Sequence, residues 1–133
     1  MKKLRSIGRI LLAIPFIVLG INHFVMQDIF IGMLSSFLPN SVYMIFISGG
    51  IMIISGIALI INKEVLLFCY VLAALLIVFI FLIHIPNMIS PPEALTINSN
   101  GLNIHLSFFS FLKDLGLLGG LLIIIGLYKE EKK

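Results

Sequence analysis

Charged residues are scarce in this sequence. Its 133 residues include only 9 Lys and Arg and 6 Asp and Glu, so 11% of the chain is charged, against about 25% in a typical soluble domain. Apolar residues make up 60%. Only Arg9, Lys113 and Asp114 bring charge into the long apolar runs, so most of the chain suits the interior of a bilayer. This composition excludes a water-soluble fold and predicts a single integral membrane domain over residues 1–133.

Cysteine is nearly absent. Cys69 is the only one and lies within an apolar run, which excludes a disulfide framework, a CxxC redox motif and a thiolate metal cluster. The net charge of +3 is a weak argument for nucleic acid, because the basic residues crowd beside the apolar runs, where they act as an orientation signal. We therefore expect no nucleic-acid partner.

Four apolar runs predict four membrane-spanning helices, at residues 7–26, 42–61, 65–85 and about 105–127. At 1.5 Å rise per residue, each reaches about 30 Å, enough to cross the hydrocarbon core. Helices satisfy their own backbone hydrogen bonds, which lipid cannot do. The fold class predicted is therefore all-α, a four-helix bundle in the membrane, with the lipid bilayer as its first partner.

Basic residues are missing from two of the segments between the runs. Residues 27–41 and 86–103 hold no Lys or Arg, whereas eight of the nine basic residues flank the opposite ends of the spans. By the positive-inside rule, both termini are cytoplasmic, as in a multi-pass protein of the bacterial cytoplasmic membrane. Because Pro15 interrupts the first run and no small-x-small site follows it, we expect a retained span, not a cleaved signal peptide.

Small residues recur in the second and fourth spans. Ser48, Gly49, Ser55 and Gly56 repeat at seven-residue spacing, and Gly116 to Gly120 supplies a GxxxG pattern. Such residues favour close helix packing within the bundle and also permit self-association into a homo-oligomer. The pattern GGx5G, shared by these two spans, is a weak indication of two related helix hairpins.

The two outer segments differ in character. Residues 28–38 are predicted to form a short helix that has apolar side chains on one face and ends at Pro39. We expect this helix to lie in the outer membrane interface or over the mouth of the bundle. Residues 86–103 contain Pro91-Pro92 and Asn100-Gly101 and are predicted to form a longer loop with turns.

Polar side chains gather near the outer ends of the spans. The candidate ligand-binding residues are His23, His84, His105, Lys113, Asp114, Asn22 and Asn87, with Gln27 and Asn103 at similar depth. Helical side chains lean toward the N-terminus of their helix, so those on oppositely running spans converge. We expect Lys113 and His105 to line an outward-opening cavity and Asp114 to bond a neighbouring helix, although the reverse assignment also fits the spacing.

Metal binding has little support. The sequence contains no HxxxH or HxxH pair, so no metal site is predicted. Two alternatives to this prediction stay open: three converging histidines could bind zinc or copper, and two histidines from different spans could bind a haem. Each histidine also suits an interfacial position on its own, and Lys113 with Asp114 suits a structural ion pair.

A set of motifs along most of the chain resembles the DoxX family of small bacterial four-helix membrane proteins. The motifs are Arg9 to Ala13 and Gly20 to Phe24 in the first span, Met33 to Pro39 after it, Ser48 to Gly50 and Gly56 in the second, His84 to Met88 closing the third, and Phe111 to Gly120 in the fourth. The Lys113-Asp114 pair before the glycine-rich stretch is the most specific of them.

The resemblance implies a redox setting. Some relatives look like membrane subunits of thiosulfate:quinone oxidoreductase, and others belong to membrane complexes that handle oxidative or thiol stress. It implies a quinone-headgroup or small-ligand pocket on the outer side, a soluble or membrane redox subunit as partner, and quinone as the cofactor. The family has no shared catalytic motif, so no residue is assigned a catalytic role.

Two other functions stay open. The first is a non-catalytic scaffold or assembly subunit, whose polar residues hold the bundle together. The second is a small-molecule transporter, for which four short helices are the right size. Small multidrug exporters carry a carboxylate in the first span, and this chain has none there, which leaves Asp114 as the candidate.

Overall fold

The computed structural model describes residues 2–34, 42–90, 96–99 and 102–131, with side chains described for 2–34, 42–90 and 107–131. The helices are α1 (Lys2–Val25), α2 (Gln27–Met33), α3 (Val42–Ile60), α4 (Val65–Phe79), the π-helical turn η1 (Ile80–His84), α5 (Ile85–Ile89) and α6 (Leu106–Glu130). Strands β1 (Thr96–Ser99) and β2 (Leu102–His105) form a short antiparallel hairpin.

Four helical stretches are long and apolar enough to cross a membrane. They are α1, α3, α6 and a composite of α4, η1 and α5 that runs over Val65–Ile89. The prediction of a helical chain with four such spans is thereby confirmed, and α1 continues through Pro15 without a break.

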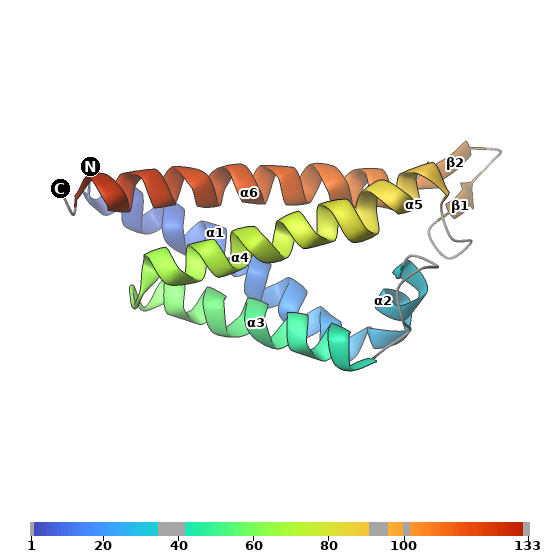
Figure 1. Ribbon diagram of the computed structural model, residues 1–133, viewed down its shortest axis with the longest axis horizontal. Coiled ribbons are helices and arrows are strands. Elements are labelled where there is room, and N and C mark those ends of the chain that lie inside the picture. Colours follow the sequence, from blue (N-terminus) through green and yellow to red (C-terminus); the bar gives the residue numbers. More distant parts are fainter. Residues whose placement is uncertain (1, 35–41, 91–95, 100–101, 132–133) are drawn as a thin grey trace.

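The four long helices form two packed pairs that spread apart toward one end (Figure 1). α1 packs mainly against α3, and α4 packs mainly against α6, whereas α1 and α6 contact each other over a short stretch. Both termini lie at one end of the molecule, together with the α3–α4 turn, and α2 lies at the other end, where the pairs spread (Figure 1).

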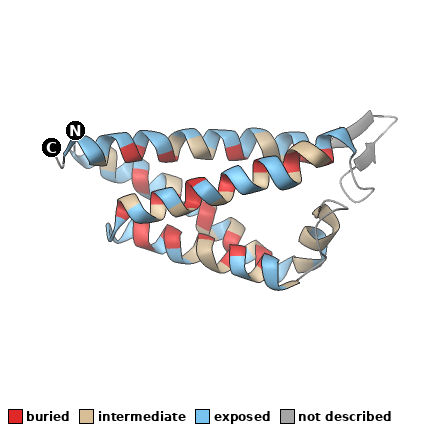
Figure 2. Cartoon of the chain, in the orientation of Figure 1, coloured by how far each residue is buried: buried red, intermediate tan, exposed pale blue. Residues whose placement is uncertain are grey.

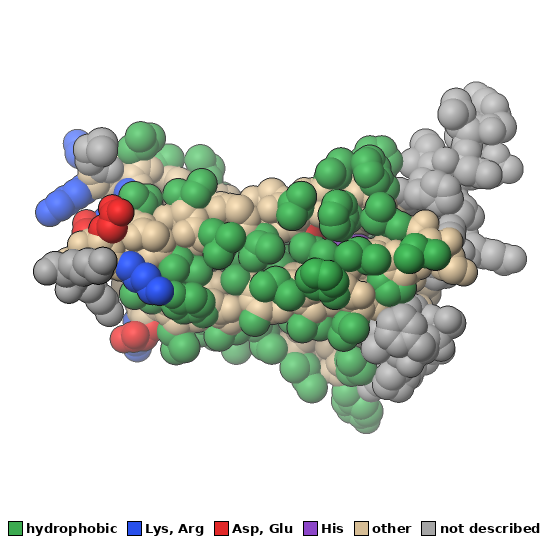
Figure 3. Space-filling model, turned by 45° about the horizontal axis from the view of Figure 1, so that its top comes forward, with side chains coloured by type: hydrophobic (Ala, Val, Ile, Leu, Met, Phe, Trp, Pro, Cys, Tyr) green, Lys and Arg blue, Asp and Glu red, His purple; other side chains and the backbone are tan. Residues whose placement is uncertain are grey.

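Apolar side chains fill the centre and also cover the outside. The core includes Ala13, Phe16, Met52, Leu59, Cys69, Leu72, Leu76 and Leu121, all 2% exposed or less, and buried residues follow the inward faces of the helices (Figure 2). Outward-facing residues are equally apolar: Leu11 and Ile54 are more than 60% exposed. In Figure 3, hydrophobic side chains cover the middle of the face shown, and the Lys and Arg side chains visible gather at the end that holds the termini.

Glycines set the distance between α1 and α3. A Cβ atom on Gly49 would lie 2.7 Å from the Cβ of His23 and 2.9 Å from the carbonyl oxygen of Gly20. A Cβ on Gly56 would lie 2.6 Å from Ile17 Cγ1. The expected packing role of the small residues in the second span is therefore confirmed.

The fourth span does not use its glycines in the same way. A Cβ on Gly116, Gly119 or Gly126 would meet nothing within 4 Å among the described residues, and only Gly120 packs closely, against Leu12. The prediction that this GxxxG pattern packs within the bundle is wrong for Gly116. The shared GGx5G pattern likewise does not correspond to equivalent packing.

The turn between α3 and α4 has a local cause in the sequence. Asn62 has a φ of 60°, a left-handed conformation that Asn tolerates better than most residues. Its backbone N–H donates to the Leu59 carbonyl, and the Lys63 N–H donates to the Ala58 carbonyl. These two bonds form the Schellman motif that commonly ends helices.

The outer segments depart from prediction in three places. The third span does not end at Ile85, because α5 continues the helix through Pro86 to Ile89. Residues 96–105 contain the β1–β2 hairpin, in which Thr96 pairs with His105, where a loop was expected. Helix α2 ends at Met33 and not at Leu38, because Leu34 adopts an extended conformation; Phe37 to Pro39 lie outside the described residues.

Candidate functional site

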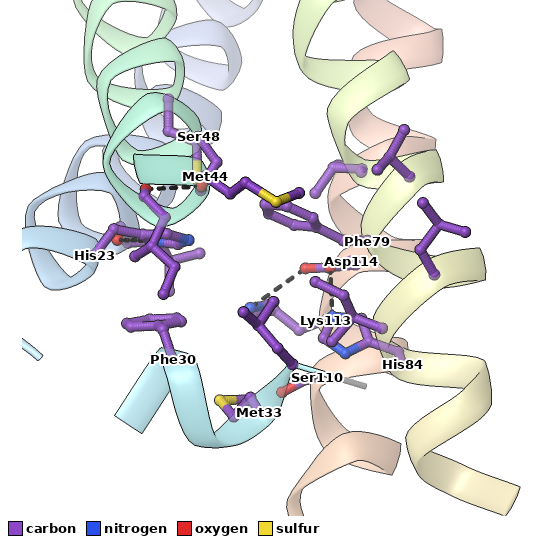
Figure 4. A pocket seen from close by; sticks show the side chains of 18 residues that line it. His23, Phe30, Met33, Met44, Ser48, Phe79, His84, Ser110, Lys113 and Asp114 are labelled. Atoms are coloured by element: carbon purple, nitrogen blue, oxygen red, sulfur yellow. Dashed lines mark hydrogen bonds and ion pairs between the residues drawn. The ribbon is translucent and has the colours of Figure 1, made fainter. Parts of the chain in front are cut away.

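A pocket of about 260 Å³ lies between the two helix pairs at the end where they spread, with α2 beside it (Figure 4). Its walls are mainly apolar, with Phe30 and Met33 from α2 and Phe79 from α4 among them. Six polar residues also line it: His23, Ser48, His84, Ser110, Lys113 and Asp114. An apolar cavity with a few convergent polar groups is the usual form of a small-molecule site.

The central group of this pocket is the carboxylate of Asp114. The residue is 1% exposed and contacts a cation on one oxygen and a histidine on the other. Lys113 Nζ lies 3.3 Å from Oδ1, and His84 Nε2 donates to Oδ2 at 2.9 Å. A buried charge of this kind is stable only when it is paired and hydrogen-bonded, and here both conditions are met.

Lys113 and Asp114 point in different directions, because adjacent positions on a helix are about 100° apart around its axis. Asp114 faces His84 of η1 and is almost completely buried, whereas the Lys113 side chain remains 43% exposed. Lys113 lines the pocket and reaches back toward Asp114 (Figure 4). The pocket thus contains an ammonium group that a ligand can reach.

His84 is placed by an irregular turn. The N–H of Ile85 bonds to the Ile80 carbonyl, five residues back, which marks the π-helical geometry of η1. Pro86 provides a cause, because it lacks an N–H and its ring crowds the preceding turn. His84 is buried, and its Nδ1 has no hydrogen-bond partner among the described residues.

His23 faces the same pocket from α1. Its Nδ1 donates to the Leu19 carbonyl at 2.7 Å, which makes Nε2 the ring nitrogen that can accept a hydrogen bond in the neutral imidazole. The ring stacks on Phe30 of α2, with centroids 4.1 Å apart, and on Phe79 at 6.1 Å (Figure 4). These contacts fix the ring plane at the edge of the cavity.

The structure therefore brings together four of the seven predicted site residues: His23, His84, Lys113 and Asp114. Asn22 is half-buried and does not line the pocket. Asn87 is buried but also lies outside the lining, and its Nδ2 donates to the Met33 carbonyl, which ties α5 to α2. The side chain of His105 lies outside the described residues.

A second polar cluster, at the end with the termini, was not predicted. Arg9 is buried, and its Nη1 donates to Asn62 Oδ1 and to the Tyr128 hydroxyl. The Tyr128 hydroxyl donates in turn to Asn62 Oδ1 at 2.7 Å. The cluster joins α1, the α3–α4 turn and α6. The one available signal was Arg9 itself, a cation inside an apolar run.

The described residues contain no group of three or more His, Cys, Asp or Glu side chains that could hold a metal ion. Comparison of the chain with family models, with curated proteins and with solved structures finds no match. The DoxX resemblance therefore stays a prediction from the motifs.

Proposed function

We propose that the chain is a multi-pass protein of the bacterial cytoplasmic membrane with both termini on the cytoplasmic side. The supporting observations are the four apolar helices and their apolar outer faces. Lys2, Lys3, Arg5 and Lys63 lie at the end with the termini, whereas Asp28 is the charged residue described on α2 at the other end. The positive-inside rule favours this orientation.

We infer that the pocket binds the headgroup of a quinone, and that the chain serves as the membrane subunit of a redox complex. The observation that carries this proposal is the accessible Lys113 ammonium beside a buried, hydrogen-bonded His84–Asp114 pair in an otherwise apolar cavity. A volume of about 260 Å³ lies just below the usual range of roughly 300–1,000 Å³ for small-molecule sites, which favours a single substituted ring.

The chemistry of quinone reduction fits these groups. A quinone takes up two electrons and two protons, and negative charge develops on its carbonyl oxygens before the protons arrive. Lys113 supplies a positive charge and one proton for that oxygen, and the His84 imidazole held by Asp114 supplies the second proton. Both groups then take up a proton again from the aqueous side. The electrons come from the redox cofactor of a partner subunit, because the chain's own residues offer no redox group beyond Cys69, which is buried in the core.

His23 and Phe30 complete the proposed site on the opposite wall. The stacked pair presents a flat surface, which suits a planar ring, and His23 Nε2 can accept a hydrogen bond from a hydroxyl group of the reduced ligand. The apolar lining from α2, including Met33 and Leu34, excludes water from the reacting oxygens.

The test is quinone-analogue binding by the purified chain in lipid nanodiscs. Short-chain benzoquinone and naphthoquinone analogues are titrated against wild type, Lys113→Met and His84→Ala, with Lys63→Met as the matched lysine control. Loss of a hydrogen bond to a charged group is worth about 1.5–3 kcal/mol, so we expect Kd to rise about 10–100-fold for Lys113→Met and to stay unchanged for Lys63→Met. Unchanged affinity in both pocket variants rejects the proposal.

A second candidate is a scaffold or assembly subunit, and one observation favours it. The His84–Asp114 hydrogen bond joins η1 to α6 directly, so the pair can serve to hold the bundle together without any ligand. This candidate predicts that substitutions of Asp114 lower the yield of the assembled complex, while no quinone analogue raises the unfolding temperature of the wild-type chain.

A further inference from the structure

Arg9 carries a buried positive charge without a matching negative one. It is 5% exposed, and within the described part of the chain its side chain bonds only neutral groups, Asn62 Oδ1 and the Tyr128 hydroxyl. Its Nε has no partner among those residues. The guanidinium group does not deprotonate in proteins, and a buried unpaired charge is costly. An anion from outside the described residues would remove this cost.

Arg9 lines a groove between α1 and α6, separate from the pocket described above. The groove has a volume of about 610 Å³ and changes in character along its length. Lys2 and Arg5 lie toward the end with the termini, and Leu12 and Ile123 form apolar walls deeper in. Its inner limit is the contact between Leu12 and Gly120, where a Cβ on the glycine would come within 2.9 Å of Leu12.

The charges around the groove leave Arg9 in excess. Arg5 forms an ion pair with Glu131, and its guanidinium also lies 4.6 Å from the centre of the Tyr128 ring. The positive charge of Lys2 and the negative charge of Glu130 cancel at the rim of the groove, where both residues are exposed. Among the described groups that line the groove, this leaves a net single positive charge, and it lies at the polar end of an apolar channel.

We propose that this groove binds an anionic membrane phospholipid. The phosphate group pairs with the Arg9 guanidinium, whose planar array of N–H donors matches phosphate oxygens. One acyl chain lies along Leu12, Ile123 and Leu127. Gly8 leaves space for the headgroup, because a Cβ at this position would meet nothing within 4 Å. The ligand thus supplies the counter-charge for Arg9. It also fills the space between α1 and α6, which contact each other over only a short stretch.

The experiment is native mass spectrometry of the full chain in mild detergent, titrated with phosphatidylglycerol, phosphatidylcholine or inorganic phosphate. We expect one phosphatidylglycerol to bind per chain, with phosphatidylcholine at least about tenfold weaker, because its choline cation cancels the phosphate charge and brings no net negative charge to the groove. Arg9→Gln and Gly8→Leu should each weaken phosphatidylglycerol binding by about tenfold or more. Gly50→Leu is the matched control, since that glycine also has open space and lies away from the groove.

The Gly8→Leu variant decides the question if Arg9→Gln does not fold, because it obstructs the groove without removing a buried bond. Equal binding of phosphatidylglycerol and phosphatidylcholine overturns the proposal, as does a Gly8→Leu variant that binds like wild type. Competition by inorganic phosphate at the same concentration as the lipid also overturns it, since the site would then recognise a free anion and not a lipid.

Discussion

At the scale of single residues, the environment of Asp114 determines what the pocket can do. The carboxylate is almost completely buried and is held by His84 on one oxygen and Lys113 on the other. Removing it would leave the buried His84 Nε2 without an acceptor, and an unsatisfied buried group costs about 1–3 kcal/mol. The pair is therefore both a structural contact between helices and the polar centre of the proposed site.

We predict that Asp114→Leu lowers the free energy of unfolding by about 1–3 kcal/mol, and that His84→Leu combined with Asp114→Leu restores most of this loss. The restoration is expected because a matched apolar pair leaves no buried polar group unsatisfied. Thermal unfolding in detergent, followed by circular dichroism across the full double-mutant cycle, measures both effects. A double variant no more stable than Asp114→Leu alone would contradict this account.

The sequence predicted part of this arrangement. Lys113 and Asp114 stood out because charges inside apolar runs are costly, and their adjacency indicated that only one of them faces a given neighbour. That Asp114 bonds His84 in particular was not predictable, since helices that are apolar on every side give no periodicity that identifies the inward face. The cluster of Arg9, Asn62 and Tyr128 was missed for a related reason: Arg9 was interpreted only as an orientation signal.

At the scale of elements, glycines determine how closely α1 and α3 approach each other. Gly49 and Gly50 are neighbours in sequence, yet only Gly49 has no room for a Cβ. We predict that Gly49→Ala lowers the free energy of unfolding by about 1–3 kcal/mol through overpacking. Gly50→Ala should be neutral or stabilising by up to about 1 kcal/mol, because alanine favours a helix. Equal effects of the two substitutions in thermal unfolding would show that the helices do not approach as closely as described.

The ends of the elements were harder to predict than their centres. Four spans follow from uninterrupted apolar runs, whereas Pro86 was taken as the end of the third span. Proline weakens a helix but does not stop one whose backbone can adopt a π-helical turn, as η1 does. The β1–β2 hairpin likewise lies in a stretch rich in turn-forming residues, where short strands carry little signal.

At the scale of the whole molecule, the arrangement places the termini and the α3–α4 turn at one end and α2 at the other. We predict that a membrane-impermeant maleimide labels Asp28→Cys from the periplasmic side of the cell, and labels Lys63→Cys and Glu131→Cys only in inverted vesicles. Cys69 is fully buried, so the native chain should show little background. Labelling of all three positions from the same side would contradict a four-span topology.

We propose that a quinone headgroup occupies the pocket between the spread helix pairs, and photoaffinity labelling can locate it there. An azidoquinone is cross-linked to the chain in membranes, with and without excess unlabelled quinone, and the adducts are mapped by mass spectrometry. We expect competed labelling within residues 30–34, 82–84 or 110–114, three segments that contribute side chains to the pocket lining. Labelling confined to the lipid-facing sides of the helices, or labelling that excess quinone does not reduce, would contradict the claim.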